Sequence, residues 1–257
     1  MAFVYTAENL LHKGFYSQEH INKKNTMAQE SHYAEIVDKL KDHSSMKQFI
    51  HRNTMMQISA IKKSLINLSL NLSKDVTAID NNVEIVYTDG GEFEAEIKFS
   101  GDALIFAMHT NVFTFPAEHK IHQLPFVKAN PKKAYCGLIQ IYNFLSDSIK
   151  YNRLNDLGYL VTRIFINSEN QFFLEGKDDL NYGIANYENQ IFDQKAIEDI
   201  IQHAIVFSID FELQVPPLEQ SEIITLAEKQ YNTTTSGMST GKRLGFEFKS
   251  SETKPLI

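Results

Sequence analysis

Three of the chain's nine histidines, His109, His119 and His122, lie close together in the sequence. Three imidazoles can hold a zinc ion and leave a fourth position open for a water molecule or a substrate. The spacing matches no established ligand pattern, and the sequence contains no His-Glu-x-x-His. The trio therefore raises a zinc-site hypothesis, with ordinary surface histidines as its alternative.

A Glu-x-Lys pattern occurs twice on segments that read as strands, at 96–98 and 175–177. In a metal-dependent nuclease such carboxylates hold magnesium, and the lysine positions the attacking water. Asp89 is the candidate third group for the first pattern, but it falls at the tip of an expected hairpin, away from Glu96. A metal-dependent hydrolase, nuclease-like or zinc-dependent, is thus the alternative function. Charges that alternate along the solvent face of a strand are the simpler explanation.

Arg163 falls in the middle of an expected strand, on the same face as Val161 and Phe165. A buried arginine needs a charged partner or a ligand. Glu175 lies directly opposite Arg163 if the turn at 168–170 is three residues long, and the two then form a cross-strand ion pair. A turn of two or four residues would leave the arginine unpaired.

An unpaired arginine predicts a pocket for a carboxylate or a phosphate, because a guanidinium binds both with two parallel hydrogen bonds. The chain also contains 18 Phe and 11 Tyr, so an apolar ligand between sheet and helices is an alternative to an ordinary aromatic core. The candidate ligand-binding residues are Arg163, Glu175, Lys177, Tyr151 and Arg153.

Residues 83–176 show the periodicity of antiparallel strands. Phe93, Ala95, Ile97 and Phe99 alternate with charged residues, which puts one set on a buried face and the other in water. A Gly-Gly pair before them permits a tight hairpin. The expected strands are 83–88, 93–99, 103–108, 112–115, 135–151, 159–167 and 172–175, of which 135–151 also fits a helix.

Residues 30–75 are expected to form two helices that separate near 52–54. In the second helix an apolar seam has the three-and-four spacing of a coiled-coil heptad. The seam packs either on the sheet or on a second copy of the chain, and the latter predicts a homodimer through Met56–Leu72. Its residues are Ile58, Ile61, Leu65, Leu68 and Leu72.

Two further helices are expected at 194–211 and 219–230. The prediction is therefore an α+β fold, in which a mostly antiparallel sheet of about six strands packs against N-terminal helices and a C-terminal helical pair. The expected organisation is an N-terminal arm at 1–28, a single domain at 29–231 and a flexible tail at 232–257. Within the domain, the helical, sheet and helical parts are 29–80, 83–176 and 194–231.

The single cysteine, Cys136, excludes an intrachain disulfide and fits a reducing compartment. No activating motif flanks it, so it is interpreted as a small buried hydrophobe rather than a nucleophile. A net charge of −7 argues against broad binding to nucleic acid. No apolar run approaches the roughly 20 residues of a membrane span, no signal peptide is evident, and no cofactor is predicted. These features indicate a non-enzymatic cytoplasmic binding or assembly protein, with a small anionic or apolar molecule as candidate ligand.

Overall fold

The computed structural model describes residues 32–176, 180, 182–211, 225–227 and 230. The predicted arm at 1–28, the predicted tail at 232–257, Lys177 and most of the predicted helix at 219–230 lie outside these residues. The chain divides into two compact units between Phe49 and Ile50.

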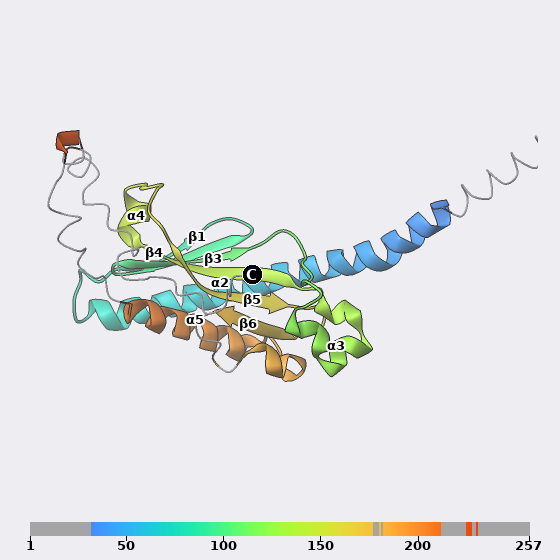
Figure 1. Cartoon of the computed structure of the whole chain (residues 1–257). Helices are drawn as coiled ribbons and strands as arrows, with labels where there is room; N and C mark the ends of the chain where they lie inside the picture. The colour runs from blue at the N-terminus through green and yellow to red at the C-terminus, as the bar shows by residue number, and fades with distance from the viewer. Residues whose placement is uncertain (1–31, 177–179, 181, 212–224, 228–229, 231–257) are drawn as a thin grey trace, which may run out of the picture. The chain divides into compact units, whose positions relative to one another are not determined.

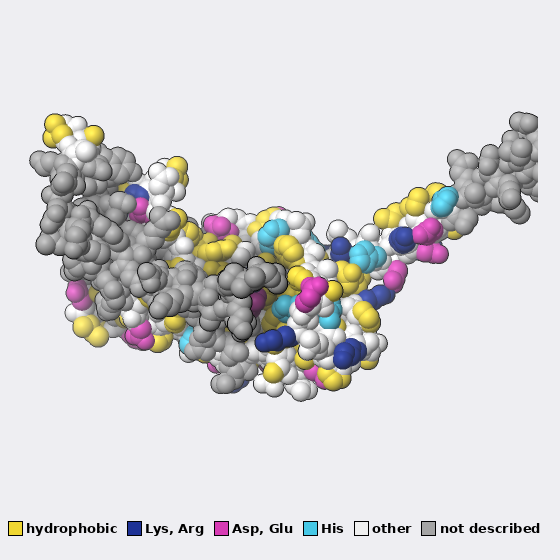
Figure 2. All heavy atoms as spheres, viewed as in Figure 1, with side chains coloured by type: hydrophobic (Ala, Val, Ile, Leu, Met, Phe, Trp, Pro, Cys, Tyr) yellow, Lys and Arg dark blue, Asp and Glu magenta, His cyan; other side chains and the backbone are white. Residues whose placement is uncertain are grey.

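The described part of the first unit, residues 32–49, is helical throughout. Residues 32–39 are α-helical, Leu40–Ser44 form the π-helical stretch η1, and α2 (Ser45–Thr77) begins directly after it. A π-helical turn accommodates extra backbone in an otherwise regular helix. Apolar, acidic and basic side chains are interspersed along this part of the helix (Figure 2).

From Ile50 onward α2 belongs to the second unit and packs on the sheet. The predicted break near 52–54 is wrong, because α2 is continuous through it. Thr54 Oγ1 donates to the carbonyl oxygen of Ile50 at 2.8 Å, and Asn53 Nδ2 donates to the carbonyl oxygen of Asn167 at 3.1 Å. Both side chains are buried. The polar residues that resemble a helix boundary are therefore buried contacts of α2.

Six antiparallel strands form one sheet, in which each strand pairs with its neighbours in the sequence. The alternation predicted around residue 95 is confirmed, since Ala95, Ile97 and Phe99 are buried. Gly91 has a φ of +93°, a conformation that permits the first hairpin turn. The strands are β1 (Ile85–Asp89), β2 (Glu94–Phe99), β3 (Asp102–Met108), β4 (Gly137–Leu145), β5 (Tyr159–Ile166) and β6 (Phe172–Gly176).

Two segments differ from the sequence-based prediction. The strand expected at 112–115 is reduced to an isolated bridge between Phe113 and Cys136. The strand expected at 135–151 is shorter, because β4 ends at Leu145 and Ser146–Lys150 form the short helix α4.

One face of the sheet is covered by α2 and by α5 (Gln194–Ile209), which lie side by side and run in the same direction (Figure 1). We call α2 from Ile50 onward, together with α5, the helical layer. Its buried side chains contact apolar residues from all of the inner strands. This main core includes Ile58, Ile61 and Leu65 of α2, Ile197, Ile200 and Ile201 of α5, and Ile97, Phe106, Ile141 and Ile164 of the sheet.

A second apolar cluster involves the opposite side chains of β4–β6. Four short helices contribute to it: η2 (Lys120–Gln123), α3 (Pro125–Ala129), η3 (Pro131–Ala134) and η4 (Ile184–Asn189). They pack with Cys136, Phe165 and Phe173. The long segment between β3 and β4 is therefore pinned by its own apolar side chains.

The predicted α+β class is confirmed. A long N-terminal helix packs on a six-stranded antiparallel sheet, and one C-terminal helix packs beside it. None of the described helices combines the length and the apolar character needed to span a bilayer.

Candidate functional site

The outer face of the sheet, opposite the helical layer, carries the residues that the sequence singles out around Arg163. Strand pairing aligns one residue from each of five strands in a row across the sheet. Because successive side chains alternate between faces, this row points away from buried neighbours such as Ala95 and Ile164. The row consists of Glu94, Ala107, Gln140, Arg163 and Glu175.

Arg163 and Glu175 form the cross-strand ion pair predicted for a three-residue turn. Arg163 Nη2 donates to Glu175 Oε2, and the guanidinium lies 5.5 Å from the centre of the Phe165 ring. The turn closes through Asn167, whose Oδ1 accepts from the backbone N–H groups of Glu169 at 2.8 Å and Gln171 at 3.0 Å. The charge of Arg163 is thus neutralised within the chain, so an incoming anion would have to compete with Glu175.

His119 lies near this ion pair. Its ring stacks on Phe115 at 4.5 Å, and its Nδ1 accepts from the backbone N–H of Ile121 at 3.3 Å, which caps η2. Burial lowers the pKa of His119, and the Glu175 carboxylate opposes that effect in part. His119 therefore has a structural role as a neutral cap.

The other two histidines of the zinc hypothesis make separate contacts. His109 Nδ1 accepts from the backbone N–H of Asn111 at 3.0 Å, and His122 Nε2 lies 3.1 Å from the carbonyl oxygen of Phe115. Within the described ranges, no three His, Cys, Asp or Glu side chains are placed to hold a metal ion. The positions of the three histidines therefore do not support the predicted trio.

Tyr151 and Arg153 were predicted to share a pocket with Arg163, but they follow α4, beyond the end of β4. Gln140, the partner of Arg163 on β4, precedes that end by five residues, which is roughly 16 Å of strand. The structure therefore brings Arg163 and Glu175 together and separates them from Tyr151 and Arg153. Lys177 lies outside the described residues.

Arg153 has its own partners at that end of the molecule. Its Nη1 lies 3.8 Å from Oδ2 of Asp156, and both side chains are buried. Ser148 donates to the same Asp156 oxygen at 2.6 Å, and the guanidinium faces the Tyr151 ring at 5.4 Å. This buried group orders the segment between α4 and β5.

The carboxylates of the nuclease hypothesis do not converge. Asp89 faces the helical layer, where Nζ of Lys62 binds its Oδ1 at 2.6 Å. Glu96 lies on the outer face, where burial raises its pKa and the neighbouring charge of Glu94 raises it further. Asp89 and Glu96 are thus on opposite sides of the sheet, which no shared metal ion could bridge.

Cys136 is fully buried in the second cluster. Its Sγ lies 3.3 Å from the hydroxyl of Tyr187, and this hydroxyl donates to the carbonyl oxygen of Lys133 at 2.9 Å. Burial raises the pKa of the thiol to about 12. A thiol that holds its proton this strongly is a poor nucleophile, in agreement with its interpretation as a core residue.

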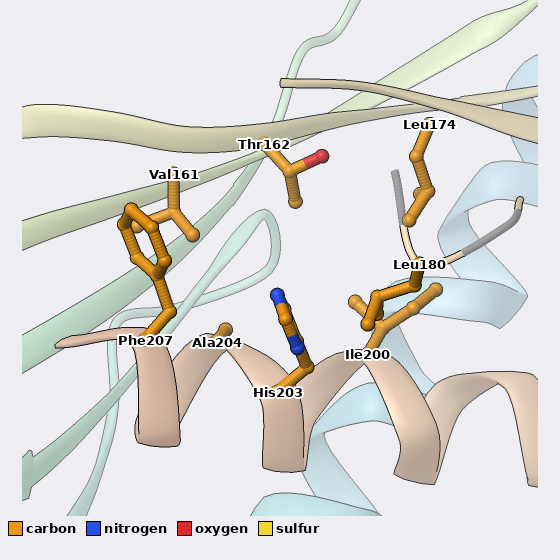
Figure 3. A pocket seen from close by; sticks show the side chains of 8 residues that line it. All are labelled: Val161, Thr162, Leu174, Leu180, Ile200, His203, Ala204 and Phe207. Carbon is orange, nitrogen blue, oxygen red and sulfur yellow. The ribbon is translucent and has the colours of Figure 1, made fainter. Parts of the chain in front are cut away.

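A small pocket lies between β5 and α5, and His203 points into it from α5 toward Thr162 (Figure 3). Val161, Leu174 and Phe207 supply apolar walls. The space is about 10 Å³, which is room for about one water molecule. Sites for small organic ligands are typically about 300–1,000 Å³, so this pocket does not fit the apolar ligand suggested by the aromatic content.

The outward face of the helical layer is a feature that the sequence analysis missed. The inner seam residues Ile58, Ile61 and Leu65 are buried against the chain's own sheet. On the opposite side of α2, Met56, Ile66 and Leu70 are 62%, 39% and 65% exposed. Together with Ser59 and Lys63, which lie between them, they follow one stripe of the helix with alternating spacings of three and four residues. This second repeat is the sequence pattern that could have predicted the outward stripe.

The outward face of α5 is also partly apolar. Val206 and Ile209 are 55% and 56% exposed. Between the two helices lies a groove of about 240 Å³ whose lining is largely polar.

No family model, no curated protein and no solved structure matches this chain.

Proposed function

We propose that this chain is a non-enzymatic, cytoplasmic assembly protein that pairs with a second copy through the outward face of its helical layer. The observation that carries the proposal is the exposed apolar stripe on α2 formed by Met56, Ile66 and Leu70. It lies within the stretch Met56–Leu72, but on the face of α2 opposite the seam through which the sequence predicts a homodimer, because Ile58, Ile61 and Leu65 of that seam are buried against the chain's own sheet. Ser59 and Lys63 lie between these apolar residues on the same stripe. Exposed apolar side chains that line up along one helix face among polar residues are typical of an interaction site.

The charges of the two helices favour a second copy as the occupant. Within the helical layer, residues 50–74 of α2 contain Arg52, Lys62, Lys63 and Lys74 but no Asp or Glu, although the whole chain has a net charge of −7. Of these cations, Lys62 is already bound by Asp89. The region of α5 is acidic, with Asp193, Glu198, Asp199 and Asp210 against a single Lys195. One layer thus presents a cationic helix beside an acidic one. A two-fold dimer joins identical surfaces, so such a layer complements itself.

The proposal is tested by measuring the mass of the full chain in solution over a range of concentrations. We expect a dimer, and we expect Leu70→Asp to weaken it at least about tenfold, because a charge would replace the most exposed apolar side chain of the stripe. Leu154→Asp is the matched control, since Leu154 is 84% exposed in the loop before β5. It should leave the dimer unchanged.

A chain that stays monomeric at every concentration would contradict the proposal. So would a Leu70→Asp variant that is folded and as dimeric as Leu154→Asp. Circular dichroism of both variants separates loss of pairing from loss of folding. Leu65→Asp should unfold the chain, because Leu65 is buried in the main core. Its circular dichroism spectrum should therefore lose the folded signal that Leu70→Asp keeps.

A further inference from the structure

The groove between α2 and α5 suggests where the two copies make their most specific contact. We infer that it receives the ammonium group of Lys63 from the second copy, beside Glu198. This inference rests on the proposed homodimer and deepens it, since it names the orientation of the copies and the residue pair that fixes it.

The groove has the lining that an ammonium group needs. Leu68 and Ile201 contribute apolar surface, and carboxamide side chains and one carboxylate surround them. A lysine ammonium has three donors and is satisfied by oxygen acceptors, while its methylene stem can pack on apolar surface. The polar side chains available to it are Asn67 and Asn71 of α2, and Glu198 and Gln202 of α5.

Glu198 is held in place within the groove. Gln194 Nε2 donates to Glu198 Oε1 at 2.6 Å and lies 3.0 Å from Ser64 Oγ. One carboxylate oxygen is therefore positioned by an amide that also links the two helices. In the described part of the chain, Glu198 takes part in no salt bridge, whereas its neighbour Asp199 is bound by Lys195 at 2.5 Å.

The direction of the helices selects the geometry of the dimer. Ser64 lies beside Gln194, and the groove continues to Asn71 on one helix and Gln202 on the other, so α2 and α5 are parallel. A two-fold axis parallel to the helices places each α2 over the α5 of the other copy. An axis across the helices would instead place α2 over α2 and bring like charges together. The charges therefore favour the first arrangement.

In that arrangement Lys63 comes to the level of Gln194 of the second copy, because Ser64 and Gln194 are level within one chain. Glu198 is four residues further along α5, about 6 Å, which a lysine side chain can span. Lys63 is exposed and makes no salt bridge to any described residue, whereas the adjacent Lys62 is bound by Asp89. The two-fold axis makes the contact twice in each dimer.

Charge reversal with mixing tests this contact. Lys63→Glu alone and Glu198→Lys alone should each raise the dimer dissociation constant at least about tenfold, since like charges then face each other at both contacts. When the two variants are mixed, every contact again joins a carboxylate to an ammonium group. We expect the mixture to form a heterodimer with an affinity within about threefold of the unaltered protein.

Sedimentation velocity with one variant fluorescently labelled measures the affinity of the heterodimer directly. Lys128→Glu, at an exposed site on α3, is the control for the change in net charge and should leave dimerisation unaffected. If the mixture stays as monomeric as its components, or if Lys63→Glu leaves the affinity unchanged while Leu70→Asp weakens it, the groove contact is wrong and the dimer stands. If the unaltered chain is monomeric, both proposals fail together.

Discussion

Glu96 combines two effects that oppose ionisation. It is half-buried on the outer face of the sheet, and Glu94 lies two residues away on the same face. Both effects raise the pKa of the Glu96 carboxyl in the folded chain, burial more than the like charge. A pKa raised on folding means that ionised Glu96 opposes folding. The stability associated with the neutral carboxyl is fully present below the unfolded pKa and is lost as the pH rises through the folded pKa.

We therefore expect Glu96→Gln to unfold at a higher urea concentration than the unaltered chain at pH 7.5. The gain should shrink as the pH falls and vanish below about 4.3, the ordinary pKa of a glutamate. Urea titrations at several pH values measure it. Glu92→Gln is the control, because Glu92 is exposed in the preceding turn. A gain independent of pH would show that the amide, rather than the lost charge, stabilises the variant.

For Arg163, the sequence predicted the ion-pair partner correctly but not the other neighbours. Alternation and turn length together predicted its partner Glu175, because both are local properties of one hairpin. The same reasoning grouped Arg163 with Tyr151 and Arg153, which the sheet places at the far end of β4. The distance between Arg163 and these two residues could not be predicted from the sequence, because it depends on the path of α4 and the loop that follows it.

At the scale of elements, the start of β4 approaches α2 closely. A Cβ atom added at Gly137 would lie 1.9 Å from Oγ1 of Thr54, which is itself buried and bonded within the helix. Only a residue without a side chain permits this approach of strand and helix. Thr54 and Gly137 therefore set the distance between α2 and the sheet.

Gly137→Ala should lower the free energy of unfolding by about 1–3 kcal/mol or more, since the core must shift to admit the methyl group. Chemical denaturation measures the loss. Gly101→Ala is the control, because a Cβ there meets no atom within 4 Å. Adding Thr54→Ala should recover part of the loss, so the double variant should be less destabilised than the sum of the single ones. Equal stability of the two glycine variants would contradict this account.

At the scale of the whole molecule, two apolar clusters lie on opposite faces of one sheet. Cys136 belongs to the second cluster and is completely buried there. Its thiol is the only one in the sequence, so it reports on the opening of that cluster without interference. Thiolates are the reactive species, and burial raises the pKa of this thiol to about 12.

We expect the folded chain to resist a thiol reagent such as iodoacetamide at pH 8. Labelling should accelerate in step with unfolding as urea is added, because both exposure and ionisation require the cluster to open. Mass spectrometry of the labelled chain measures it, and the fully denatured chain provides the reference rate. Rapid labelling in the absence of denaturant would mean that the second cluster opens independently of the fold.

Local periodicity was sufficient for most strands of the sheet, for the buried alternation of β2 and for the α+β class, because main-chain pairing and burial repeat every two residues along a strand. It also predicted a strand at 112–115, where the structure has only an isolated bridge. It was insufficient for α2. Asn53 and Thr54 resemble a helix boundary until their buried partners are known. The heptad spacing of the apolar seam does not distinguish packing on the chain's own sheet from packing on a second copy. Only the tertiary structure decided that the chain's own sheet buries Ile58, Ile61 and Leu65. That choice leaves Met56, Ile66 and Leu70 facing outward, because the face of a helix opposite its core contacts is determined by what it packs against.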